Sequence, residues 1–151
     1  LAEACRRFPM PDGAQAERAL RELSWGEHFV AGRMVPSKGG SDLYLYNLKS
    51  AAVFLLDRDQ ANIGKASDQI IKLIDVDAFA AWVRGTVGDD ALADALAEEC
   101  PAEDPYHDRL EGVQRLLALR MVQYGALEGA GGGTEGDEHD RAPLGAGAAS
   151  L

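Results

Sequence analysis

Residues 104–127, DPYHDRLEGVQRLLALRMVQYGAL, are the stretch that decides the fold. Their apolar side chains recur at steps of three or four residues, which is the spacing of one face of an α-helix. This stripe consists of Tyr106, Leu110, Val113, Leu117, Met121 and Tyr124. Pro105 opens the pattern, because proline is tolerated in the first turn of a helix. We therefore expect a long amphipathic helix from about Asp104 to about Leu127.

Five more helical segments are predicted upstream of this helix. They cover residues 12–26, 41–56, 67–74, 77–87 and 90–99. Each begins at Asp or Ser, whose side chains accept hydrogen bonds from the free N–H groups of a first turn. Gly88 and Pro101 stop two of them. Together the six segments supply enough apolar surface for one core, so we predict a mainly α fold, a compact bundle of about five to six helices.

A short β element near residues 28–46 is the alternative to an all-helical domain. The segment from His28 to Val35 is followed by Pro36 and by Gly39-Gly40, which are turn residues. The start of the 41–56 segment contains Tyr44 and Tyr46, and tyrosine favours strands. The sequence leaves open whether residues 28–46 are strand or helix.

Composition divides the chain into three parts. Residues 1–11 are predicted to be a flexible N-terminus, and residues 12–128 a single helical domain. Residues 129–151, GAGGGTEGDEHDRAPLGAGAASL, have one large aliphatic residue before the final Leu151. Such a segment buries too little apolar surface to offset the entropy of ordering, so we predict a Gly/Ala-rich, acidic, disordered tail.

The charge excludes some classes of partner. The formal net charge is −10 at pH 7, which argues against nucleic-acid binding. Residues 1–56 contain six acids and seven bases, whereas residues 57–104 contain twelve acids and four bases. Many acids of this middle region, such as Asp75 and Asp89, fall at predicted helix starts, where they cap N–H groups. No apolar run is longer than Ala51–Leu56, which is far shorter than the ~20 residues of a membrane helix, so no membrane contact is expected.

The two cysteines and the catalytic templates point away from an enzyme. Cys5 and Cys100 form no CxxC pair, which predicts two reduced thiols in a cytoplasmic protein. No GxSxG motif is present. Residues 57–68 have acids at positions 1, 3 and 12 of a calcium loop, but Ala61 and Asn62 occupy two positions that need other residues. We interpret this segment as an ordinary connection between helices.

One group of side chains could bind a metal ion. Asp104, His107, Asp108 and Glu111 are spaced at i, i+3, i+4 and i+7, so they share one face at the start of the last helix. Carboxylate and imidazole groups are ligands for divalent transition metals such as iron, zinc and manganese. Glu27 and His28 could complete the set if the fold brings His28 to His107. A metal-binding protein or metal-dependent enzyme is therefore the alternative function.

The leading functional hypothesis is a small protein-interaction or self-associating module without catalytic activity or cofactor. It depends on the predicted 41–56 helix, which carries apolar residues on both of its sides. A helix of this kind lies in the centre of a fold or is covered by a partner. The residues expected to contact a protein partner or a second copy are Leu43, Tyr46, Val53 and Phe54.

Overall fold

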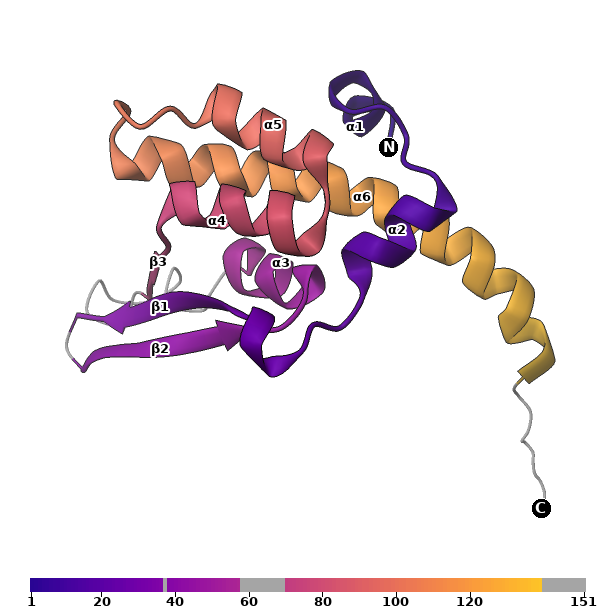
Figure 1. The fold of residues 1–151 in the computed structure, drawn as a ribbon, viewed down its shortest axis with the longest axis horizontal. Coiled ribbons are helices and arrows are strands. Elements are labelled where there is room, and N and C mark those ends of the chain that lie inside the picture. The colour runs from indigo at the N-terminus through magenta and orange to yellow at the C-terminus, as the bar shows by residue number, and fades with distance from the viewer. Residues whose placement is uncertain (37, 58–69, 140–151) are drawn as a thin grey trace, which may run out of the picture.

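The structure is a computed structural model that describes residues 1–36, 38–57 and 70–139. This part of the chain is mainly helical and contains a small antiparallel sheet of three strands. In Figure 1 the sheet lies on one side of the molecule, α3 lies next to it, and α4, α5 and α6 lie beyond α3. The prediction of a mainly α fold is confirmed, but this layered arrangement is not the compact bundle that we expected.

The elements have the following bounds. The α-helices are α1 (Ala2–Arg7), α2 (Gly13–Leu20), α3 (Leu48–Leu56), α4 (Val76–Trp82), α5 (Asp90–Glu99) and α6 (Tyr106–His139). The strands are β1 (Phe29–Val35), β2 (Gly39–Leu45) and β3 (Ile71–Leu73). A 3₁₀ turn, η1 (Trp25–Glu27), precedes β1, and a π-helical turn, η4 (Val83–Val87), continues α4.

The sheet corrects two helix predictions. Its order is β2-β1-β3, and both pairings are antiparallel. The predicted 41–56 helix begins only at Leu48, because Asn47 caps it by accepting a hydrogen bond from the Ser50 N–H (2.6 Å), and residues 39–45 pair with β1 instead. The predicted 67–74 helix is also wrong where it is described, since residues 71–73 form β3. Residues 67–69, and the predicted connection after Asp57, lie outside the described residues.

The remaining helices agree more closely with the sequence patterns. α5 has the predicted bounds, and Asp89 accepts a hydrogen bond from the Leu92 N–H at its start (3.1 Å). α4 and η4 together span the predicted 77–87 helix, and Gly88 ends them with a φ of 87°. That positive φ explains the glycine, because other residues rarely adopt it. α2 ends at Leu20, earlier than the predicted Gly26.

Helices occupy parts of both terminal segments of the described chain. Within residues 1–11, α1 packs on α6, and Ala4 and Phe8 are buried. The Gln123 side chain donates a hydrogen bond to the Phe8 carbonyl (2.9 Å), which helps to hold this segment in place. At the other end, α6 continues beyond Leu127 to His139, into the segment predicted as a tail.

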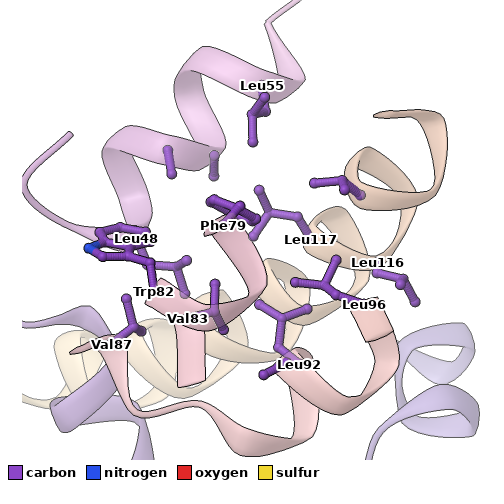
Figure 2. Packing of buried hydrophobic residues seen from close by; sticks show 14 of the residues in the cluster. Leu48, Leu55, Phe79, Trp82, Val83, Val87, Leu92, Leu96, Leu116 and Leu117 are labelled. Atoms are coloured by element: carbon purple, nitrogen blue, oxygen red, sulfur yellow. The ribbon is translucent and has the colours of Figure 1, made fainter. Parts of the chain in front are cut away.

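The core lies between α3, α4, α5 and α6. Figure 2 shows Leu48 and Leu55 of α3 facing Phe79 of α4 and Leu117 of α6, with Leu92 and Leu96 of α5 on the far side. Each such side chain contributes about 1.5–3 kcal/mol when it is fully buried. No helix in the described ranges is both long and apolar enough to cross a membrane. The inner face of the sheet closes this core through Phe29, whose ring contacts those of Phe79 and Trp82.

Candidate functional site

The predicted metal-binding group is only partly assembled. Ligand atoms of His107, Asp108 and Glu111 lie within 4.8 Å of one another, and all three residues are exposed. His107 Nε2 lies 3.3 Å from Glu111 Oε2. Asp104 does not join them, because α6 begins at Tyr106 and the Asp104 N–H bonds the Pro101 carbonyl (3.1 Å) in the preceding turn.

His28 lies in a different environment from His107. Its Nδ1 donates a hydrogen bond to the Trp25 carbonyl, and its ring contacts those of Trp25, Tyr44 and Tyr46. His107, in contrast, is paired with Glu111 on α6. The structure therefore gives the α6 cluster no contact with Glu27 or His28.

The four predicted partner-binding residues divide between two surfaces. Leu43, Val53 and Phe54 line a groove of about 600 Å³ between β2 and α3. Val53 is 70% exposed there, whereas Phe54 is largely buried. Tyr46 is outside this groove and belongs to the aromatic group around His28. The separation follows from the strand at residues 39–45, since side chains of a strand alternate between its two faces.

A second surface, which we call the outer sheet face, is apolar across all three strands. The register places Val30 opposite Tyr44, Gly32 opposite Leu73 and Met34 opposite Ile71. Opposed residues of paired strands project from the same side of a sheet. The outer sheet face therefore consists of His28, Val30, Met34, Asp42, Tyr44, Tyr46, Ile71 and Leu73, extended by Trp25 of η1.

The aromatic end of this face has a defined geometry. The His28 ring centroid lies 5.4 Å from that of Trp25 and 5.0 Å from that of Tyr44, both in edge-on contacts. Trp25 nevertheless remains 76% exposed and Tyr44 53% exposed. A capping box between Ser24 and Glu27 fixes the turn that carries Trp25. The rings are thus positioned by local structure while a large part of their surface meets solvent.

The inner side of the same sheet is anchored to the helices. Phe29, Ala31 and Leu45 are buried, and the Trp82 indole N–H donates to the Glu27 carbonyl (2.8 Å). Tyr106 of α6 fixes β3, because its hydroxyl accepts from the Ile74 N–H (3.0 Å) and donates to the Lys72 carbonyl (2.7 Å). These buried side chains and hydrogen bonds on the inner side therefore hold the outer sheet face in place.

A buried polar network occupies the opposite part of the molecule. Asp89, fully buried, accepts hydrogen bonds from Arg120 Nε (2.9 Å) and Nη2 (3.0 Å) and from the Tyr124 hydroxyl (2.5 Å). Burial, and then the hydrogen bond to Asp89, raise the pKa of Tyr124 to about 12. Arg120 also donates to the Pro9 carbonyl (3.2 Å). These polar groups satisfy one another, so the network joins α5, α6 and the N-terminal segment as a structural unit.

The sequence patterns missed most of the outer sheet face. Trp25, Val30 and Met34 belong to none of the predicted sites, and Ile71 falls within the predicted 67–74 helix. A usable signal existed in residues 28–35, where apolar residues occupy both alternating sets of positions. That pattern indicates a strand with two apolar faces, of which one is Phe29 and Ala31 in the core.

Comparisons with known proteins add no identification: no family model matches the chain, and no curated protein or solved structure is significantly similar to it.

Proposed function

We propose that this protein is a non-catalytic protein-interaction module and that its binding surface is the outer sheet face. The observation that carries the proposal is a concentration of exposed apolar groups. Eleven large hydrophobic side chains are exposed among the described residues, and six of them lie on this one surface. These six are Trp25, Val30, Met34, Tyr44, Ile71 and Leu73.

The chemistry of the surface supports a protein as the ligand. Contiguous exposed apolar patches are rare on monomeric proteins and mark interaction sites when they are large. Tryptophan and tyrosine are enriched among residues that dominate binding energy, because they bury much area and lose little entropy. Elsewhere, burial raises the pKa of the Cys100 thiol, which makes it a poor nucleophile at neutral pH.

Site-specific photo-crosslinking in the producing cell tests this proposal. A photoreactive residue at Met34 samples the outer sheet face, and the same residue at Val122, an exposed position on α6, is the matched control. We expect an adduct of defined mass from position 34 alone, and its loss when Leu73→Lys is added beside the probe. Equal adducts from both positions, or none from position 34, would contradict the proposal.

The groove between β2 and α3 extends the proposed binding region. Leu43, Val53 and Phe54 line it, and Tyr44 of the outer sheet face lines it as well, so the two surfaces meet at β2. We propose that a partner bound on the sheet contacts Val53 at the edge. The Val53→Glu variant should then reduce the position-34 adduct less than Leu73→Lys does; a larger reduction would place the main contact in the groove.

We also propose a cytoplasmic site of action, where the unpaired Cys5 and Cys100 would remain reduced.

Metal binding at the start of α6 is the second candidate function. It is supported by the convergence of His107, Asp108 and Glu111, and these groups could supply ligands to a divalent transition metal. All three side chains are exposed, however, and no described group orients the second ring nitrogen of His107, as ligating histidines usually require. Thermal unfolding with added Zn²⁺ or Mn²⁺ decides the matter, because a specific ligand of the folded state raises Tm. A rise that His107→Ala abolishes would establish this function; an unchanged Tm would remove it.

A further inference from the structure

We infer that the occupant of the outer sheet face is a second copy of this chain, bound about a two-fold axis so that Trp25 of each copy enters a notch on the other. This inference rests on the proposed function, because it names the partner of the same surface. Four observations lead to it: the shape of the face, the unused hydrogen-bonding groups at its two ends, its area, and the distribution of charge.

The shape of the face is complementary to itself. Trp25 projects at the end of the sheet where β1 begins and β2 ends, next to His28. Towards the hairpin end, Gly32 and Gly40 leave a notch of about 340 Å³, bordered by Met34, Asp42 and Leu73. Val30 and Tyr44 lie between these two features. A two-fold axis near the Val30–Tyr44 pair brings each Trp25 to the notch of the other copy, as an isologous interface requires.

Each end also has a polar group without a partner. Within the described chain, the Trp25 indole N–H makes no hydrogen bond, and the Asp42 carboxylate accepts none. A two-fold arrangement places the donor of each copy against the acceptor of the other copy, so the same hydrogen bond forms twice. Each Trp25 would bury its ring against Met34 and Leu73 and donate its N–H to Asp42 of the second copy. Buried indole rings usually find such an acceptor.

The area of the face is near what a stable dimer requires. The six apolar side chains are between 39% and 76% exposed. With side-chain areas of roughly 150–250 Å², they offer on the order of 600 Å² of apolar surface, against about 800 Å² in total per partner in a typical interface. Polar rim atoms such as those of Asp42 supply the rest.

Charge distribution explains why two acidic copies can meet here. Residues 75–104, which contain α4 and α5, hold nine acids and one base. In the paired strands, Asp42 is the one acid on the outer sheet face. Two bases, Arg33 and Lys72, are on the opposite face of the sheet. In Figure 1 the sheet and α5 lie on opposite sides of the molecule. Contact through the sheets therefore keeps the two acidic layers apart, which lowers the repulsion between copies.

Sedimentation and fluorescence of the full chain test the inference. The chain has two tryptophans, and Trp82 is buried in the monomer, so a change of emission on dilution reports Trp25. We expect a concentration-dependent dimer whose emission shifts to longer wavelength as it dissociates, with no such shift in Trp25→Phe. Trp25→Ala should raise the dissociation constant about 30-fold, as expected for a tryptophan that is buried in a pocket of the partner. Gly40→Val, which fills the notch without touching Trp25, should weaken the dimer similarly, and Val122→Ala should leave it unchanged.

The outcomes separate this inference from the function on which it rests. A chain that stays monomeric up to about 1 mM, or a dimer that Trp25→Ala and Val122→Ala affect equally, overturns the proposed dimer. A monomer that still gives the position-34 adduct with another protein overturns the dimer and leaves the proposed function intact. Loss of both the adduct and the dimer overturns both. Tm values for each variant ensure that only folded proteins are compared.

Discussion

Asp89 is the residue at which three separate segments of the chain meet. It caps α5 through the Leu92 N–H and binds Arg120 through two hydrogen bonds, and Arg120 in turn holds the Pro9 carbonyl. Two cation–π contacts of Arg120, with Phe8 and Tyr124, add to the same junction. An ion pair this deeply buried is stabilising only while both partners are present, because either one alone is an uncompensated charge.

We therefore expect Asp89→Ala to destabilise the protein by about 3–5 kcal/mol, the usual cost of leaving one buried charge unpaired. Urea unfolding followed by circular dichroism measures the change. Asp90→Ala is the matched control, since Asp90 is the next residue and its side chain is 76% exposed beside Arg84. The control should change the free energy of unfolding by less than about 1 kcal/mol. Equal effects of both substitutions would contradict the structural role of Asp89.

Tyr124 adds a dependence on alkaline pH to the same junction. Its pKa is raised to about 12 in the folded chain, against about 10 when unfolded, so between these values the unfolded state has lost a proton that the folded state retains. The contribution of Tyr124 to the free energy of unfolding is therefore fully present below pH 10. It falls by about 2–3 kcal/mol as the pH rises to 12. Tyr124→Phe should remove that part of the fall, although it weakens the protein at neutral pH. Urea midpoints of both proteins across pH 8–12 provide the test, and parallel curves would contradict it.

At the scale of elements, the contact between α5 and α6 depends on a missing side chain. A Cβ on Gly112 of α6 would lie 2.8 Å from the Cys100 Sγ at the end of α5. That distance is too short for two such atoms, and Cys100 is buried and cannot turn aside into solvent. Gly112 thus lets the two helices approach closely, at the expense of helix propensity.

Gly112→Ala should consequently destabilise the protein by up to about 2 kcal/mol, because an overpacking cost of about 1–3 kcal/mol is offset by a gain of ~1 kcal/mol in helix propensity. Gly125→Ala on the same helix is the control: nothing lies within 4 Å of its Cβ position, so it should stabilise the protein. Adding Cys100→Ala to Gly112→Ala should recover part of the loss, as a thermodynamic cycle of Tm and urea data will show. Stabilisation by Gly112→Ala alone would mean that the helices are further apart than described.

Sequence patterns predicted those elements whose signals are local. α5 has the predicted bounds because Asp89 and Asp90 supply a cap and a first-turn charge within a regular apolar pattern. Residues 39–45 lie in the segment that the sequence left open between strand and helix, and their pairing with β1 decides that they form a strand. β3 is likewise fixed from a distance by the Tyr106 hydroxyl. The predicted 41–56 helix put Leu43, Val53 and Phe54 on one surface. They do line one groove, but they do so because β2 lies next to α3, and not because they belong to a single helix.

The whole molecule separates its apolar surface from its acidic one. Within the described ranges, residues 75–104, which contain α4 and α5, hold nine acids and one base. The aromatic end of the sheet, with Trp25, His28 and Tyr44, is available for contact, and Glu27 is the one acid in the turn that carries Trp25. Had the acids bordered the sheet instead, two copies would associate only when salt screened their repulsion.

This separation predicts how the dimer proposed above responds to salt. The Debye length is about 10 Å at 0.1 M salt, so charges on the far layers of two copies are already screened from one another. We therefore expect the dissociation constant to change less than about threefold between 0.1 and 0.5 M NaCl, with the contact carried by apolar burial and the short-range Trp25–Asp42 bond. Leu73→Glu moves an acid onto the apolar face, and its residual dimer should tighten steeply with salt. A wild-type dimer with that same steep response would place the acidic layers at the interface and contradict the sheet-to-sheet arrangement.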